Sequence, residues 1–319
     1  MRPRLLPDTA ALLSMTPQSS PVVLAGSTGN LGGRIARALL DRGAETRAIV
    51  RRGSAADRVE ALRRRGASII EVDFGNAAEL TAACAGGSCV VSALSGLHEV
   101  IVERQTQLLS AAVAAGVPRF IPSDYAIDFA NVPTGKNRNL DLRREFHERL
   151  DRAPIAATSI LNGMFADLLT GRAPVVLFPL QRVVYWEDAD QPLDFTTMDD
   201  TAAFAAAAAR DPSAPRVLRI AGDVISARGL AAAATEATGR KFRLVRAGGL
   251  GRLETLITIT RAVFPQSGAV YPAWQGMQYL RDMFSGRGKL EPLDNGRYPG
   301  MPWTTTRDVL AAHELGRHG

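Results

Sequence analysis

The chain has 319 residues, of which 46% are hydrophobic and 22% charged, close to the averages of globular proteins. This composition excludes a disordered, fibrous or membrane-spanning chain, and at about 150 residues per domain the length allows one large domain or two. Lys plus Arg exceeds Asp plus Glu by 38 − 32 = 6 charges, which favours small anionic ligands. Aromatic residues are only 6%, and no basic cluster is interleaved with them, so direct binding of nucleic acid is not expected.

The N-terminus and the cysteines indicate where in the cell the protein is located. Residues 1–20 are interrupted by Pro7 and Asp8 before they reach signal-peptide length, so we expect a disordered extension, and Met15 is an alternative start to Met1. No window approaches the roughly 20 apolar residues that a spanning helix needs. Cys84 and Cys89 are too close in sequence to cross-link a fold, which favours a reducing compartment. A soluble, cytoplasmic protein is the expectation.

Short apolar runs alternate with amphipathic stretches in the first half of the chain. Strands are predicted at residues 22–25, 46–50, 68–72, 89–93 and 120–122, and helices at 31–41, 55–65, 77–85 and 99–115. Parallel strands that are buried on both faces read as continuous hydrophobic runs, as VVLA and VVSAL do. The pattern therefore predicts an α/β fold with a Rossmann-type, doubly wound parallel sheet over residues 21–165.

The pattern loosens after residue 123. A charged helix, DLRREFHERLDR, precedes AATSIL, which we predict as a sixth strand of the sheet. Further on come the apolar runs VVLFPL and RVVYW, a helix at 200–209, the strand RVLRIAG and a helix at 227–238. We predict that residues 166–319 form a smaller C-terminal substrate lobe, interleaved with the first domain. Its last segment is rich in Met and aromatic residues, which suits either an apolar ligand wall or ordinary core packing.

The glycine-rich stretch VVLAGSTGNLGGRIARALL carries the most specific signal. A hydrophobic strand runs directly into a G-x-x-G-x-x-G turn and then into an amphipathic helix. Glycines adopt backbone angles closed to other residues and leave room for a pyrophosphate, and the start of the helix offers free N–H donors. We therefore predict a dinucleotide-binding turn. Its residues are Gly26, Ser27, Thr28, Gly29, Asn30 and Leu31.

The GSTGNLGG string, together with RAIVRR, RFIPSDYAIDF and SILNGMF, resembles the NmrA-like and isoflavone-reductase-like group of atypical short-chain dehydrogenases. The resemblance extends from residue 22 to the end of the 220s. It implies a nucleotide domain, a small substrate lobe and a pocket between them. It further implies that four segments follow the cofactor from the adenine to the nicotinamide, in agreement with the rule that ligands lie beyond the carboxyl ends of parallel strands. These segments are Asp73 and Phe74; Ala93, Leu94 and Ser95; Pro122, Ser123, Asp124 and Tyr125; and Asn162, Gly163, Met164 and Phe165.

The end of the second strand bears on the choice of nucleotide. Sites selective for NAD have an acidic residue there to bind the ribose hydroxyls, whereas this chain has Arg51 and Arg52. An arginine can hold a 2′-phosphate through two hydrogen bonds. We therefore expect NADP(H), with NAD as a possible second cofactor, and the resemblance points the same way. The alternative is that the two arginines are only solvated charges at a strand end.

The proton donor of a reduction is harder to identify. No tyrosine is followed four residues later by lysine, and the lysine that isoflavone-reductase-like enzymes carry on the helix after the fifth strand falls near Asp141 in this chain. Tyr125 and Lys136 are the catalytic candidates that remain. A packed ring and a solvent-exposed loop charge are the alternatives for them. The four histidines show no metal-ligand spacing and no serine lies in a G-x-S-x-G elbow, so neither a metal site nor hydrolase chemistry is expected.

Three functions fit these observations. The first is an NADP(H)-dependent reductase of a small apolar carbonyl, quinone or enone. The second is an NmrA-like sensor that binds NAD(P) without turnover and acts through a protein partner, which the missing lysine favours. The third is an epimerase or isomerase that recycles its cofactor. Oxidation of NADPH with a panel of quinones, enones and aldehydes separates the first from the other two.

Overall fold

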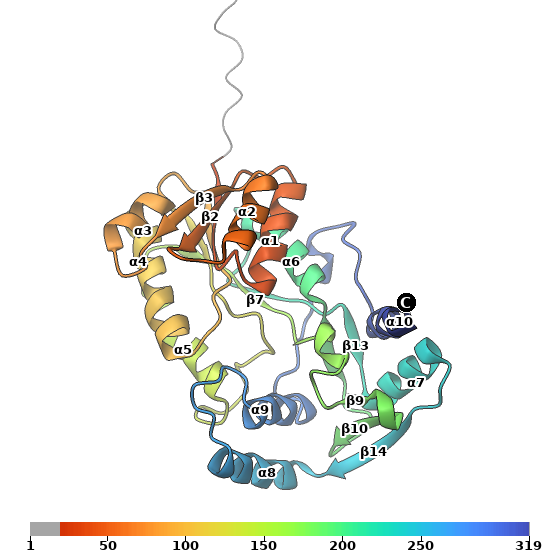
Figure 1. Ribbon diagram of the computed structural model, residues 1–319. Helices are drawn as coiled ribbons and strands as arrows, with labels where there is room; N and C mark the ends of the chain where they lie inside the picture. The colour runs from red at the N-terminus through yellow and green to blue at the C-terminus, as the bar shows by residue number, and fades with distance from the viewer. Residues whose placement is uncertain (1–19, 319) are drawn as a thin grey trace, which may run out of the picture.

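The molecule has two lobes that share a long boundary (Figure 1). The computed structural model describes residues 20–318, so the expected extension and the alternative start at Met15 lie outside the described residues, apart from Ser20. The first lobe is built on a six-stranded parallel sheet with the order β3-β2-β1-β4-β5-β6. Its strands are β1 (Val22–Ala25), β2 (Thr46–Arg51), β3 (Ser68–Val72), β4 (Cys89–Ser92), β5 (Arg119–Ile121) and β6 (Ala156–Ala157). The predicted Rossmann-type sheet is confirmed.

Helices cover both faces of this sheet because successive strand residues point to opposite sides. In β1, Val22 and Leu24 join the core on one side, whereas Val23 and Ala25 join the core on the other. Both sides are buried, which is why the strand reads as an unbroken apolar run. The crossover helices are α1 (Asn30–Asp41), α2 (Ala56–Arg64), α3 (Ala77–Cys84), α4 (Gln105–Ala114) and α5 (Arg138–Leu150).

Two predicted elements differ in the structure. The stretch AATSIL, predicted as one strand, is divided: Ala156–Ala157 pairs with β5, whereas β7 (Ser159–Leu161) leaves the sheet and pairs with β12 (Val217–Arg219). The sequence is continuously apolar there, but the pairing partner changes because a strand from later in the chain lies alongside. The helix predicted at 99–115 begins as a π-helix, Glu99–Arg104, and continues as α4.

The second lobe contains small sheets and four helices. Its strands form the sheets β14-β10-β9 and β13-β11-β8. Their bounds are β8 (Met164–Phe165), β9 (Val176–Leu177), β10 (Arg182–Trp186), β11 (Leu193–Thr196), β13 (Asp223–Ile225) and β14 (Arg243–Gly248). The helices are α7 (Ala227–Thr238), α8 (Leu250–Val263), α9 (Ala273–Phe284) and α10 (Thr306–His318). None of the described helices combines the length and the apolar character that crossing a bilayer demands.

One helix from the second half of the chain belongs to the first lobe. α6 (Met198–Ala209) packs along α1 (Figure 1), and its Phe204 is fully buried in the same core as Leu24. Asp199 at its start forms an ion pair with Arg37 of α1. The predicted interleaving of the two halves therefore takes the form of a helix that completes one face of the nucleotide-type sheet.

Candidate active site

The glycine-rich turn connects β1 to α1, leaves no room for a side chain at Gly26 and Gly32, and is tight at Gly29. Gly26 has φ +83°, and a Cβ on it would lie 2.5 Å from the main-chain oxygen of Ala93. A Cβ on Gly32 would lie 2.0 Å from the oxygen of Gly26, and one on Gly29 would lie 3.1 Å from the same atom. The turn is closed by a hydrogen bond from the Gly29 amide to the Gly26 oxygen (2.9 Å). The predicted turn is therefore built from close main-chain approaches that only glycine permits.

The start of α1 keeps its amide groups available. Gly29 is the N-cap residue and supplies no side-chain hydrogen bond, so the first N–H donors of the helix are not satisfied by a cap. The hydroxyl of Ser27, in the turn, is buried without a hydrogen-bond partner among the described residues. Arg58 of α2 reaches across to donate to the main-chain oxygen of Thr28 (2.9 Å). An anion placed at this turn would meet free donors and the positive end of the helix dipole.

The two arginines at the end of β2 have different surroundings. Arg52 donates to Glu79 (2.8 Å) and is 62% exposed. Glu79 also accepts a hydrogen bond from the amide of Asp73 (2.9 Å). Both contacts lower the pKa of Glu79, and the amide of Asp73 contributes more than Arg52. Arg51 is exposed, and within residues 20–318 its side chain makes no hydrogen bond or ion pair. Arg51 is thus the arginine of the pair that is available to a ligand.

The loops after β3 and β4 are the next predicted cofactor segments. Asp73 is exposed and accepts a hydrogen bond from the amide of Gly75 (2.8 Å), whereas Phe74 is buried in the core on the α3 side. Ala93 continues the β4 direction by donating to the oxygen of Ala25 (2.9 Å), directly beside Gly26. Leu94 is half-buried and Ser95 exposed. The β4 loop therefore runs along the glycine turn.

The segment after β5 is tied to the β4 loop and to α5. The Ser123 hydroxyl donates to the oxygen of Leu94 (2.6 Å), and the Ser123 amide donates to Gln105 (2.8 Å). Asp124 is fully buried and its Oδ2 lies 2.9 Å from His147 Nε2 of α5. Burial alone would raise the pKa of Asp124, but the charge and hydrogen bond of His147, a hydrogen bond with Ser159 and the charge of Arg143 together outweigh it and hold this pKa below its usual value. Asp124 therefore carries a negative charge beneath the loop at neutral pH.

Asn162 and Gly163 follow β7 and lie against the same region. Their amides both donate to the oxygen of Ala126, at 2.9 and 3.1 Å. Gly163 has φ +69°, and a Cβ on it would come within 2.3 Å of the oxygen of Asp194, so a side chain is excluded. The Asn162 side chain is fully buried, and neither its oxygen nor its nitrogen has a partner among the described residues. Met164 and Phe165 form β8, which pairs with β11.

Buried polar atoms that lack partners concentrate at the carboxyl edge of the parallel sheet and at the end of the neighbouring β7. Most of those found in residues 20–318 belong to side chains at or just after the carboxyl ends of β1, β4, β5 and β7. Such groups are rare in folded proteins and call for a partner. The set at this edge comprises Ser27 Oγ, Ser92 Oγ, Asp124 Oδ1, Tyr125 OH, and both polar atoms of the Asn162 side chain.

The two predicted proton donors lie in different settings. Tyr125 is buried, with φ +25°, and its ring packs in the core that contains Ile121 and Ile160. Burial strongly raises the pKa of its phenol. Lys136 is 56% exposed and its ammonium lies 3.3 Å from Glu254 of α8. No hydrogen bond joins Tyr125 to Lys136 in the described part of the chain, so the structure does not bring this pair together, and their catalytic roles stay predictions.

Comparison with known proteins decides the family. Residues 18–270 match the profile of the NmrA-like family. The chain belongs to the NmrA-like family. Pinoresinol reductase 1 of Arabidopsis thaliana is 30% identical over an alignment of 212 residues that covers 61% of this chain and 66% of the relative, so the matched part falls just short of two thirds of that protein.

Solved structures share the fold of this NmrA-like protein. Leucoanthocyanidin reductase of Vitis vinifera in complex with NADPH gives a TM-score of 0.76 at 18% identity, covering 92% of this chain and 99% of that one. An NADPH-dependent quinone oxidoreductase of Escherichia coli gives 0.69 at 21% identity, covering 91% and 98%. The likeness extends over the second lobe, where the sequence resemblance is weakest.

Two residues of α5 in this NmrA-like chain were not among the predicted site residues. Arg143 is 7% exposed and donates from Nε to the main-chain oxygen of Asp124 (2.7 Å). His147, one turn later, is the partner of Asp124 described above. The buried positions of α5 include Leu140, Arg143, Phe146 and Leu150, and charge on such an apolar stripe is the signal that could have identified Arg143. Asp141, by contrast, is paired with Arg144 (2.6 Å).

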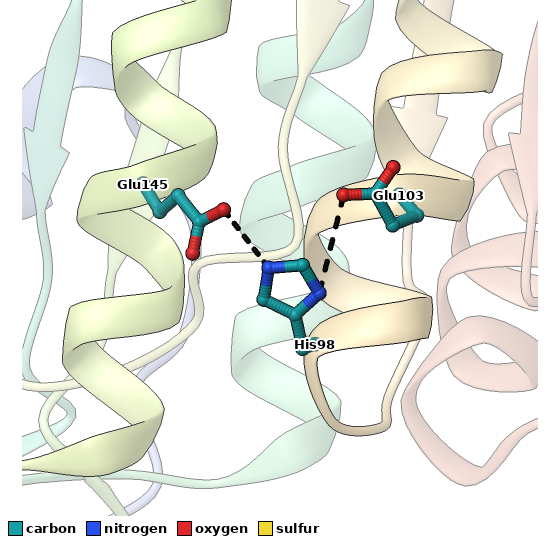
Figure 2. A group of neighbouring side chains, drawn as sticks. All are labelled: His98, Glu103 and Glu145. Atoms are coloured by element: carbon teal, nitrogen blue, oxygen red, sulfur yellow. Dashed lines mark hydrogen bonds and ion pairs between the residues drawn. The ribbon is translucent and has the colours of Figure 1, made fainter.

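A second histidine joins α5 to the loop after β4. His98 lies between Glu145 of α5 (2.9 Å) and Glu103 of the π-helix (3.9 Å) (Figure 2). These three side chains are the group with metal-ligand spacing found within the described residues. Arg149 is also paired with both glutamates, at 3.2 and 3.4 Å. The group is thus a surface ion-pair network that holds the π-helix against α5, and Arg149 supplies the positive charge that a metal would bring.

Proposed function

We propose that this protein is an NADP(H)-dependent reductase of a small, mostly apolar carbonyl, quinone or enone. The observation that carries the proposal is the row of unpartnered polar atoms and bare amides along the carboxyl edge of the parallel sheet. Ligands of open α/β sheets bind at this edge. The relatives and structural neighbours named above are themselves reductases, which favours a reductase over the sensor alternative.

The residues present fit a dinucleotide. The glycine turn is closed against side chains at Gly26 and Gly32 by its own main chain, and the α1 amides and the Ser27 hydroxyl are the donors for the pyrophosphate. Arg51, unpaired within the described residues, is the group for a 2′-phosphate. Ser123, Asp124 and Asn162 border the place where the nicotinamide belongs, in line with the resemblance. NAD is the possible second cofactor, because the glycine turn does not distinguish it from NADP.

The cofactor, when bound, supplies the hydride, and the chain has to position the substrate and exclude water. The buried, hydrogen-bonded segment at Ser123 and Asp124 forms a rigid floor. A proton must also reach the reduced substrate, and Tyr125 and Lys136 remain the proposed donors. Pinoresinol and leucoanthocyanidin appear in the names of the similar proteins reported above. For this chain we propose only the broader class of small apolar substrates.

Calorimetric titration with NADP⁺ and NAD⁺ tests the cofactor assignment, with Arg51→Ala as the variant and Arg52→Ala as its matched control. Arg51→Ala should weaken NADP⁺ binding by about tenfold or more, the size of a lost charge-assisted hydrogen bond, and leave NAD⁺ binding unchanged. Arg52→Ala, whose side chain is already held by Glu79, should change both affinities little. Absence of binding by either nucleotide at millimolar concentration would remove the proposal. Oxidation of NADPH in the presence of a quinone, enone or aldehyde then separates the reductase from a sensor.

A further inference from the structure

Arg143 is a buried positive charge without a carboxylate partner. It is 7% exposed, and its Nε and Nη1 donate to main-chain oxygens of Asp124 (2.7 Å) and Asn139 (2.8 Å). No carboxylate among residues 20–318 lies within ion-pair distance of it. No direct ion pair therefore compensates the charge of this buried guanidinium.

The groups that face Arg143 offset its burial without a direct ion pair. Burial would lower the pKa of Arg143, but the phenols of Tyr279 and Tyr271, the charge of Asp124 and a hydrogen bond with the Tyr271 side chain together outweigh burial and raise this pKa. Burial raises the pKa of Tyr279 well above neutrality, so its phenol is uncharged at pH 7. Asp124 does carry a charge, but its carboxylate is committed to His147, and only its main-chain oxygen contacts Arg143.

The other buried arginines of the described chain serve as a comparison. Arg281 is paired with Asp282 and Glu254, both at 2.8 Å. Arg119 also lacks a carboxylate, but it lies at the start of β5 and its terminal nitrogens are taken up by Thr158 and by the 212–214 turn. Arg143 thus differs from both, because it combines the lack of a direct ion pair with a position at the carboxyl edge of the sheet.

Arg143 lies where the two lobes meet. The N-terminal end of α5 is fastened to α9 by Asn137, which donates to Asp282 (2.8 Å) and accepts from Gln275 (2.8 Å). Asn139 donates to the oxygen of Val270, next to Tyr271 (3.0 Å). Figure 1 shows α5 running from the sheet toward α8 and α9. The buried cation therefore stands between the predicted nicotinamide floor and the second lobe.

We propose that Arg143 is the anion-binding group of the substrate site and holds the substrate oxygen on which negative charge develops. The inference rests on the proposed reductase function. When a hydride adds to a carbonyl carbon, the C=O π pair moves to the oxygen, NADPH becomes NADP⁺, and the oxygen then takes a proton from an acid. A guanidinium remains protonated throughout, so Arg143 stabilises the charge without giving up its own proton.

An aromatic carboxylate and its amide test this role without turnover. Benzoate carries negative charge on oxygen, whereas benzamide has nearly the same shape and no charge. We expect benzoate to bind the NADP⁺-loaded protein about tenfold or more tightly than benzamide, the size of one charge-assisted hydrogen bond. The preference should vanish in Arg143→Met and be partly kept in Arg143→Lys. Calorimetry gives both affinities, and a thermal melt and the NADP⁺ affinity of each variant report on folding.

Two results would overturn the assignment: no preference for benzoate in the wild-type protein, or a preference that survives in a folded Arg143→Met variant. Should Arg143→Met fail to fold, Arg143→Lys and Arg143→Gln provide the same comparison, and loss of the preference in Gln with retention in Lys supports the role. Failure of the proposed function looks different, because NADP⁺ binding would then be absent in the wild-type protein. The benzoate and benzamide titrations are also run without nucleotide, so the two failures are distinguished.

Discussion

Neighbouring glycines of the turn differ in what a side chain would meet. A Cβ on Gly32 would lie 2.0 Å from a main-chain oxygen that cannot move aside, whereas a Cβ on Gly33 would lie 3.4 Å from the oxygen of Ser27. Gly32→Ala should therefore destabilise the fold by about 1–3 kcal/mol or more and abolish nucleotide binding. Gly33→Ala, inside α1, should stabilise it by about 0.5–1 kcal/mol. Urea unfolding and NADP⁺ titration of both variants check this, and equal behaviour of the two would contradict the geometry.

The Asp124–His147 pair stabilises the floor of the site in a pH-dependent way. Since the folded-state pKa of Asp124 lies below its usual value, the pair stabilises the fold above about pH 4 and loses its effect as the pH falls through that lowered pKa. His147→Leu leaves a buried carboxylate without its partner and should cost about 2–3 kcal/mol at pH 7. Urea unfolding at pH 7 and below about pH 4 should show this cost shrinking in acid.

His98→Leu is the matched control. Like His147, His98 contacts a carboxylate, that of Glu145, but its side chain is half exposed. Its cost should be at most about 1 kcal/mol at pH 7. If His98→Leu lost as much unfolding free energy as His147→Leu, burial of Asp124 would not be the reason that the Asp124–His147 pair stabilises the fold. The double variant Asp124→Asn, His147→Leu should recover part of the stability, since no carboxylate charge is then buried at this position.

At the scale of elements, the sequence predicts those strands, helices and turns whose formation depends on the local residue pattern. The central strands β1 and β4 were found because a parallel strand buried on both faces is largely apolar, and the turn after β1 was found because its glycines have a fixed spacing. The division of residues 156–161 was not predictable, since it depends on β12, some 60 residues later. Arg143 carried a local signal, a charge on the apolar stripe of α5, but its contact with Tyr271 of the other lobe could not be predicted from local pattern.

Cys84 and Cys89 report on how individual elements open. Cys84 ends α3, at the surface of the sheet, and Cys89 begins β4, at its centre. Burial raises the pKa of Cys84 to about 11 and that of Cys89 to about 12, so at pH 8 only about one Cys84 thiol in a thousand is ionised. Neither should react with a disulfide reagent until its element opens. Cys84 should label first, because a peripheral helix opens at lower free energy than a central strand.

Labelling of the single variants Cys84→Ser and Cys89→Ser measures the two rates separately. In Cys84→Ser, the remaining thiol should react only under conditions that unfold the whole protein. In Cys89→Ser, reaction should precede global unfolding. The reverse order would mean that the centre of the sheet opens before its covering helix.

At the scale of the whole molecule, we predict that residues 20–165, up to the sequence-based boundary, do not fold alone. Phe204 of α6 is fully buried against β1 and α1, and burying one such ring contributes about 3–5 kcal/mol, against a net stability of about 5–15 kcal/mol for a domain.

A fragment of residues 20–165 lacks α6 and the β12 partner of β7. It should bind a hydrophobic dye and melt without a cooperative transition. A fragment of residues 20–226, which retains both, should recover a cooperative, lower-melting transition by calorimetry, and the full chain should unfold as one unit. If residues 20–165 melted cooperatively at the temperature of the full chain, α6 would be a covering of the sheet and not a part of its core.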